Sequence, residues 1–312
     1  DKAFFNNKEI FLYDDESLEQ LIFLYDKEMT SQTSTLVSYA YDLLTFFRYL
    51  QYSNPTFANK SMTDFTIEDL AKLTSEDISE YQRYLELNED GEKHENGKKA
   101  IARKMAPLRG MFLYHLEHEH IEKNPMILVK LPRIKKDKNI IRMNENEVTD
   151  VLNTVEFGNA QMSKHQLAFR ERTRERDLAI MTLMLGTGIR VSECVGLNLD
   201  DLDLEENGIH IHRKGGKEST VYFSDEVAQY LKRYFEERTA QDLDLQQEPA
   251  LFLSLRKQRI AVRSVEYLVK KYAAIATPKK KITPHKLRSS YGSALYAKTN
   301  DIYLVADILG HN

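Results

Sequence analysis

The sequence predicts a mainly α-helical protein: an all-helical domain, then a mixed α/β domain of helices with a small antiparallel sheet. From Ser17 to about Ile121, apolar residues recur at the three- and four-residue spacing of amphipathic helices. After residue 207, two short stretches alternate apolar and polar residues, which is the pattern of half-buried strands. With 42% hydrophobic residues, a chain of 312 residues can bury two ordinary cores.

The first domain is expected to hold four or five helices. One of them is ESLEQLIFLYDKEM, and the next is TSTLVSYAYDLLTFFRYLQ, with Ser34 or Thr35 as its N-cap. A third starts at Ser75, where Thr74 or Ser75 caps a first turn rich in acids. The fourth, KKAIARKMAPLRGMFLYHLEHEH, contains Pro107, which kinks a helix unless its first turns are irregular.

The stretch NPMILVKLPRIKKDKN carries two prolines, several lysines and no amphipathic period, so it predicts an interdomain linker. Beyond it, a helix capped by Asn144 and the helix RTRERDLAIMTLMLG, which ends at glycine, begin the second domain. A short helix, VSECVGL, follows. The strands GIHIHRK and STVYFS are joined by KGGKE, a hairpin signature, ALFLS predicts a third strand, and helices continue to the end.

The formal net charge of −4 does not by itself indicate a nucleic-acid-binding protein, but the charges are segregated. Basic residues concentrate in GKKAIARKMAPLRG, KLPRIKKDKNIIR, LRKQRIAVRSVEYLVKK and TPKKKITPHKLR. Each cluster alone also fits a solvated helix face; together they predict one basic face. The single Cys194 excludes an intramolecular disulfide and suits a small buried side chain in a reducing compartment. Without a membrane span or a signal segment, we expect a cytoplasmic protein.

Five side chains that bind phosphate or transfer protons lie on unusual local backbones. Arg190 follows a glycine-rich turn, Lys214 lies at the hairpin, His285 and Arg288 share PHKLR, and His311 lies in LGHN. Each alone has an ordinary explanation, as a surface residue, a hairpin lysine, a helix cap or a frayed end. Together, with no carboxylates paired beside them, they predict a phosphodiester site. Arginine forks bind two oxygens at once, and a departing alkoxide needs an acid.

The stretches TGIRVSECVGLNLDDLD, RKGGKESTVYF, TPHKLRSSYGSALY and DILGHN resemble the motifs of the tyrosine recombinase (phage integrase-like) family, in particular its bacterial Xer type. The segment GNAQMSKHQLAFRERTRERD favours the single-recombinase, XerS-like branch. The resemblance implies a helical core-binding (SAM-like) DNA-binding domain over 1–126, a basic linker over 127–142 and a catalytic domain over 143–312.

The resemblance also implies a role for each of the five residues. Arg190 and Arg288 correspond to the arginines that grip the non-bridging oxygens of the scissile phosphate. Lys214 corresponds to the lysine that protonates the departing 5′ oxygen. His285 corresponds to the histidine that assists proton transfer, and His311 to the one that hydrogen-bonds the phosphate.

In this family the attacking tyrosine follows the last histidine, and the sequence ends one residue after His311. We therefore expect residues 1–312, in which the catalytic domain over 143–312 is truncated before the nucleophile, to bind DNA without cleaving it. Tyr291, Tyr296 and Tyr303 precede that histidine and are expected to pack between helices.

The activity that the resemblance implies is site-specific recombination through a 3′-phosphotyrosyl intermediate, with no cofactor and no metal. Chromosome dimer resolution, integration of a mobile element and inversion of a segment all use this chemistry, and the sequence does not choose among them. The implied partners are double-stranded DNA with a pseudo-palindromic site, a homo-tetramer on two sites, and a cell-division DNA translocase, with no membrane. DNA contacts outside the site are expected from clustered basic residues of one helix, the linker and a later helix: Lys98, Lys99, Arg103, Lys104, Arg109, Lys135, Lys136, Lys138, Arg256, Arg259 and Arg263.

Three other functions remain open from the sequence. His115, His118 and His120 allow a metal-dependent site, although only the first two share a helical face. A non-catalytic, sequence-specific DNA-binding regulator on the same fold would keep the basic faces without needing the five-residue constellation. A type IB topoisomerase would use the same tyrosine chemistry without a specific site.

Overall fold

The computed structural model describes residues 3–5, 8–10, 33–61, 64–87, 96–134, 141–158, 160, 162–213, 218–240 and 249–310. The chain divides into two compact units, Asp1–Lys136 and Asp137–Asn312, so the division lies within the predicted linker. The predicted helix ESLEQLIFLYDKEM lies outside the described residues. No described helix is long and apolar enough to cross a lipid bilayer.

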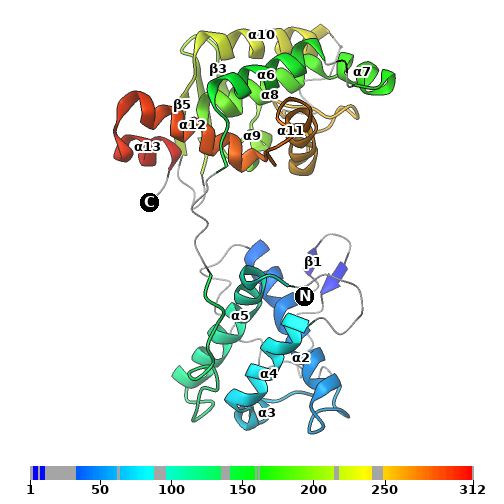
Figure 1. Cartoon of the computed structure of the whole chain (residues 1–312), viewed down its shortest axis with the longest axis vertical. Coiled ribbons are helices and arrows are strands. Elements are labelled where there is room, and N and C mark those ends of the chain that lie inside the picture. Colours follow the sequence, from blue (N-terminus) through cyan, green and yellow to red (C-terminus); the bar gives the residue numbers. More distant parts are fainter. Residues whose placement is uncertain are drawn as a thin grey trace. The chain divides into compact units, whose positions relative to one another are not determined.

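Within its described residues, the first unit has one short strand pair, and its other regular elements are helices (Figure 1). Its elements are β1 (Ala3–Phe5), antiparallel to β2 (Lys8–Ile10), then α2 (Thr33–Ser53), α3 (Ile67–Lys72), α4 (Ser75–Leu87) and α5 (Lys98–Glu117). The sequence analysis missed the strand pair and α3. Aromatic rings form much of the core: Phe46 lies edge-on to Tyr81 with ring centroids 5.0 Å apart, and both side chains are fully buried.

The ends of these helices test the predicted caps. Thr74 caps α4 as predicted, because its Oγ1 accepts from the Asp77 amide and its own amide donates to Asp77 Oδ2 at 2.8 Å. The predicted cap at Ser34 or Thr35 is wrong, since α2 already begins at Thr33. Pro107 lies inside α5, which the structure gives as one helix.

The second unit surrounds a small sheet with helices. Its helices are α6 (Glu145–Phe157), α7 (Lys164–Glu171), α8 (Arg174–Thr187), α9 (Val191–Gly196), the 3-10 turn η2 (Leu199–Asp201), α10 (Asp225–Ala240), α11 (Val262–Ala276), α12 (Pro284–Thr299) and α13 (Ile302–Leu309). The strands β3 (Leu202–Asp203), β4 (Gly208–His212) and β5 (Glu218–Tyr222) pair antiparallel in that order. The predicted fold class is confirmed.

The predicted strand at ALFLS is wrong. That segment makes only isolated bridges, Asn198 with Ala250 and Leu253 with Arg259, and β3 is the third strand instead. The segment is buried without forming a ladder, and its apolar run reflects that burial. A short apolar run does not distinguish a buried strand from another buried segment.

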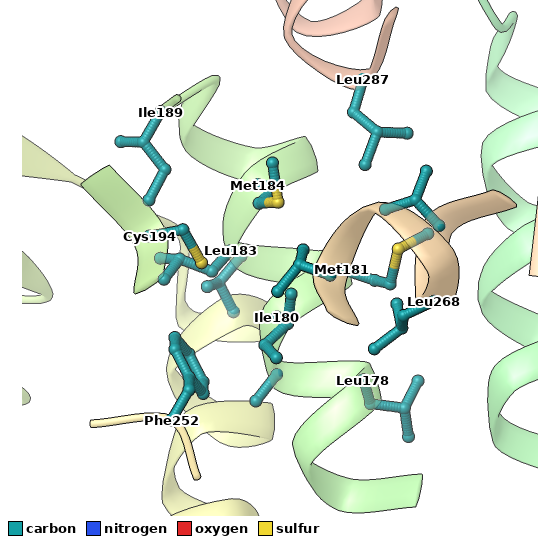
Figure 2. Close-up of a cluster of buried hydrophobic side chains, with 14 of the residues drawn as sticks. Leu178, Ile180, Met181, Leu183, Met184, Ile189, Cys194, Phe252, Leu268 and Leu287 are labelled. Atoms are coloured by element: carbon teal, nitrogen blue, oxygen red, sulfur yellow. The ribbon is translucent and has the colours of Figure 1, made fainter. Parts of the chain in front are cut away.

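Helix α8 is the central element of the second core. Buried residues occur on all sides of it, from Leu178 to Met184, which is typical of a helix enclosed by others. Figure 2 shows its side chains gathered with Ile189, Cys194, Phe252, Leu268 and Leu287 from other elements. Cys194 is fully buried, as predicted, and burial raises the pKa of its thiol to about 12, so it is an inert packing residue. A rigid α8 fixes the position of the turn that follows it.

Candidate active site

The turn after α8 carries Arg190. Gly188 is the C-cap of α8 in the left-handed conformation, with φ 65°, and its amide donates to the Met184 carbonyl at 3.0 Å. A Cβ at this position would overlap the Tyr291 ring and lie 3.0 Å from Leu309 Cδ2. Glycine is therefore required both for the backbone conformation and for the close approach of α12 and α13. The chain then reverses, and Arg190 becomes the N-cap of α9.

A buried carboxylate holds Arg190 in place. Glu193 Oε2 accepts from the Arg190 amide at 2.7 Å, and Oε1 accepts from its Nη1 at 2.7 Å. The Glu193 side chain is 5% exposed, whereas the Arg190 side chain is 37% exposed. Glu193 was not among the residues predicted for the site. The sequence contained a signal for Glu193: an acid three residues after an N-cap is the spacing of a capping box.

Arg288 reaches the same turn from α12. Its side chain is buried, with the residue 6% exposed, and its Nη1 donates to the Gly188 carbonyl at 2.5 Å. Its Nη2 donates to the Leu309 carbonyl, while Arg190 Nη2 donates to the next carbonyl, that of Gly310, at 3.4 Å. Burial lowers the pKa of Arg288 to about 10; the charges of Arg190 and Arg213 act in the same direction, and Glu193 opposes them. The two predicted phosphate-binding arginines are thus brought together.

A third arginine, which the sequence analysis missed, completes the group. Arg213 directly follows β4, and its Nη2 donates to the Ile308 carbonyl at 2.8 Å. We call Arg190, Arg213 and Arg288 the arginine cluster. All three donate to carbonyls of the last turn of α13, where a helix carries partial negative charge, and this partly offsets their mutual repulsion.

The other predicted catalytic residues are placed less fully. His285 is exposed in the first turn of α12, one turn before Arg288. Lys214 and His311 lie outside the described residues; in the sequence they directly follow Arg213 and Gly310. The catalytic roles of all five residues stay predictions.

The three tyrosines before His311 differ in burial. Tyr291 is half-buried, packs against Gly188, and has a pKa raised by burial. Tyr296 and Tyr303 are 44% and 84% exposed, so the prediction that they pack between helices is wrong. Tyr296 belongs to α12 and Tyr303 to α13, the last two helices of the described chain (Figure 1).

The predicted DNA-contacting residues fall into four groups. Lys98, Lys99 and Arg109 on α5, with Arg256 and Arg263 near and on α11, are exposed. Arg103 donates two hydrogen bonds to the buried Asp42, at 2.6 and 3.0 Å, and Lys104 lies 3.7 Å from the same carboxylate. Arg259 donates to the carbonyls of Val195 and Leu197 and to Asn198 Oδ1. Lys135, Lys136 and Lys138 lie outside the described residues.

The histidines of the metal alternative make hydrogen bonds. His120 does not point away, as its spacing suggested, because the C-cap turn of α5 brings its Nδ1 within 3.0 Å of His115 Nδ1. His118 Nδ1 lies 2.9 Å from the Tyr114 carbonyl. Among the described residues, no three histidine, cysteine or acidic side chains are grouped to hold a metal ion.

Comparison with known proteins agrees with this geometry. Residues 142–312 match the Phage integrase family. The chain is 30% identical to tyrosine recombinase XerC of Caldanaerobacter subterraneus subsp. tengcongensis over 95% of this chain and 79% of that protein. It is 31% identical to tyrosine recombinase XerS of Lactococcus lactis subsp. cremoris, over 92% of this chain and 86% of the relative.

Two solved structures share the fold. XerH site-specific recombinase bound to difH substrate, a pre-cleavage complex, matches with a TM-score of 0.63 and 20% identity, covering 92% of this chain and 75% of that one. A lambda integrase(75-356) dimer bound to a COC' core site matches with a TM-score of 0.65 and 15% identity, covering 95% of each chain. With the sequence matches, this likeness shows that the chain belongs to the phage integrase family, as a tyrosine recombinase.

Proposed function

We propose that this protein is a site-specific DNA recombinase that cuts and rejoins strands through a 3′-phosphotyrosyl intermediate. The observation that carries the proposal is the convergence of Arg190 and Arg288, from two different elements, on the last turn of α13. The pair supplies two guanidinium groups from a rigid core at a spot where Arg190 stays partly exposed. Two such forks suit a phosphodiester, whose negative charge grows on the non-bridging oxygens during attack.

The proposed reaction is a transesterification. A tyrosine hydroxyl gives up its proton, to His285 or to water, and its oxygen forms a bond to phosphorus while the bond from phosphorus to the 5′ oxygen breaks. Arg190 and Arg288 stabilise the charge on the non-bridging oxygens, and Lys214 donates a proton to the departing 5′ oxygen, with assistance from His285 and His311. Attack by a free 5′ hydroxyl reverses these steps. The phosphotyrosyl bond retains the energy of the broken phosphodiester bond, so the strands can be rejoined without another energy source. No metal or organic cofactor is needed for any of these steps.

The biological setting that we propose follows the same family resemblance. The protein acts in the cytoplasm as a homo-tetramer on two pseudo-palindromic sites in double-stranded DNA. Its role is chromosome dimer resolution during cell division and chromosome partition, with a cell-division DNA translocase as partner. Support for this setting comes from the relatives named XerC and XerS.

A suicide-substrate assay tests the reaction. Duplexes are selected from a random library by binding to the full-length protein, and are then nicked so that cleavage traps the covalent adduct. We expect an adduct with the wild-type protein. Arg190→Ala should reduce adduct formation by roughly 100- to 1,000-fold with nearly unchanged DNA affinity, because that guanidinium acts mainly on the transition state.

Arg233→Ala is the matched control. Arg233 is an arginine of α10 that pairs with Glu156 and Glu175, outside the arginine cluster, so its loss should leave adduct formation intact. Binding without any adduct from the wild-type protein would establish the regulator alternative. Relaxation of plasmids that lack a selected site would instead indicate the topoisomerase.

A further inference from the structure

Arg213 is bound to the end of α13 more extensively than a surface arginine at a hairpin would be. Its two Nη atoms donate to successive carbonyls of α13, at 3.4 Å to Asp307 and 2.8 Å to Ile308. Its Nε is buried and has no hydrogen-bond partner among the described residues. Both terminal nitrogens thus engage the protein itself, and the side chain connects the end of β4 with the end of α13.

The approach of Arg213 also explains the glycine after α13. Gly310 has φ 61°, in the left-handed region, and is the C-cap of the helix. A Cβ at this position would overlap Arg213 Nη1 and lie 2.8 Å from its Cζ. The guanidinium group therefore lies directly against the Gly310 backbone, and any larger residue there would displace one or the other.

Arg213 and Gly310 also adjoin two predicted catalytic residues. Lys214 follows Arg213 in the chain, and His311 follows Gly310. Arg213 is joined by one peptide bond to Lys214, and Gly310 by one peptide bond to His311. A shift of Arg213 relative to α13 therefore changes the distance between Arg213 and Gly310. Meanwhile Arg190 and Arg288 donate to the same helix turn, to Gly310 and Leu309. The last turn of α13 and its C-cap thus accept hydrogen bonds from all three residues of the arginine cluster.

We propose that Arg213 is a positioning residue: it clamps the last turn of α13 to the end of β4 and so fixes the two described chain positions, Arg213 and Gly310, that Lys214 and His311 follow in the sequence. The catalytic part of this inference rests on the proposed function. Arg213 acts through the backbone of α13 and makes no contact with the phosphate. Its loss should therefore affect the rate of cleavage and leave DNA affinity largely unchanged, because misplacing reacting groups by about 1 Å can cost roughly 100-fold in rate.

The first test measures the clamp without DNA. Hydrogen exchange of the α13 amides is compared in the full-length wild-type protein, Arg213→Ala, Arg213→Lys and the control His212→Ala. His212 precedes Arg213 and is 68% exposed, so its variant reports any general effect on the strand. We expect faster exchange in the last turn of α13 for Arg213→Ala, an intermediate rate for Arg213→Lys, and no change for His212→Ala. Equal exchange in all four proteins overturns the clamp.

The second test measures cleavage under single-turnover conditions on a nicked duplex selected by binding. Arg213→Ala should cleave about 10- to 100-fold more slowly, with a Kd within about threefold of wild type, and Arg213→Lys should recover part of the rate. A loss of affinity equal to the loss of rate would instead make Arg213 a DNA-binding residue and overturn the proposal.

A double-mutant cycle adds a readout that general destabilisation does not give. Gly310→Ala should slow cleavage less in the Arg213→Ala background than in wild type: the backbone strain at φ 61° is common to both, but the overlap with the Arg213 guanidinium is absent from the first. Additive effects contradict the inference. If the wild-type protein forms no adduct, the proposed function fails and hydrogen exchange alone decides the clamp. If it does form one and Arg213→Ala cleaves equally fast, only this inference fails.

Discussion

Arg190 and Arg288 are both proposed to bind the scissile phosphate, but their environments in the folded protein differ. Arg190 is held by a carboxylate, Glu193, and keeps a third of its side chain exposed. Arg288 is buried and donates to the backbone carbonyls of Gly188 and Leu309. A buried cation close to two others is unfavourable, which the lowered pKa of Arg288 reflects. Glu193 is the acid that counters this effect, so it influences both arginines.

Glu193→Gln tests that influence at the level of one residue. The amide keeps the shape of the side chain but removes its charge, and its NH₂ group cannot accept from Arg190. We expect single-turnover cleavage to slow by about tenfold with little change in DNA affinity. Because Glu193 raises the pKa of Arg288, removing its charge lowers that pKa further. The alkaline limb of the pH–rate profile should therefore move to lower pH.

Glu205→Gln is the control for the loss of one acid, since Glu205 is exposed in the turn before β4. An unchanged rate and an unchanged alkaline limb for Glu193→Gln would show that the carboxylate only caps α9.

Among the elements, the short helix α3 depends on one buried carboxylate. Asp69 accepts from the Thr66 amide at 3.0 Å and from Lys72 Nζ at 3.2 Å, and it also pairs with Lys60. Burial raises the pKa of Asp69, but the hydrogen bonds from Lys60, Thr66 and Lys72 outweigh it and bring the pKa to about 2, from 3.8. The helical unit is thus stabilised by a charge that the sequence pattern did not indicate.

Asp69→Asn should therefore lower stability in a pH-dependent way. The folded pKa lies below the unfolded one, so the stabilisation is complete above about pH 5 and is lost as the pH falls towards 2. We expect the variant to be less stable by about 2 kcal/mol at pH 7, and the difference to shrink between pH 5 and pH 3. Calorimetry of the full chain measures it. Glu68→Gln, on an exposed acid of the same turn, should show no such trend, and a constant difference for Asp69→Asn would refute the assignment.

At the scale of the whole molecule, the net charge is −4, yet both units carry exposed basic residues. Lys98 and Arg109 are exposed on α5, and Arg263 is exposed on α11. DNA binding through such residues releases counterions and depends steeply on salt. Arg259, although in the same basic cluster as Arg263, donates to the backbone of Val195 and Leu197 and so belongs to the fold.

The salt dependence of DNA binding distinguishes basic residues that contact phosphates from a basic residue, such as Arg259, that stabilises the fold. Lys98→Ala, Arg109→Ala and Arg263→Ala should each make the slope of log K against log salt shallower by about 0.9, as expected for one lost phosphate contact. Arg259→Ala should lower the melting temperature instead and leave the slope unchanged, because it removes hydrogen bonds from three buried or half-buried acceptors. Anisotropy titrations with a selected duplex, and thermal melts, measure both. Identical slopes for all four variants would place the DNA contacts elsewhere.

Local patterns in the sequence were enough to predict the helices that carry strong amphipathic periods or recognisable caps, such as α4 behind Thr74 and α6 behind Asn144. They failed at ALFLS, where burial without pairing leaves the same apolar pattern as a strand. They also missed α3, which at six residues is too short to show a period. Arg190 and Arg288 were found because each lies in a short motif whose residues are contiguous in the chain.

What surrounds those two arginines was decided by the tertiary structure. Arg288 donates to Gly188, 100 residues earlier, and Arg213 donates to Ile308, 95 residues later. Hydrogen bonds over such separations leave no spacing that a local pattern can reveal. The same is true of Arg103 and Arg259, whose acceptors Asp42 and Val195 lie 61 and 64 residues away in the sequence. Residue type and local order thus identified Arg190 and Arg288, whereas the packing of α8, α12 and α13 decided that Arg213 joins them and which atoms hold all three.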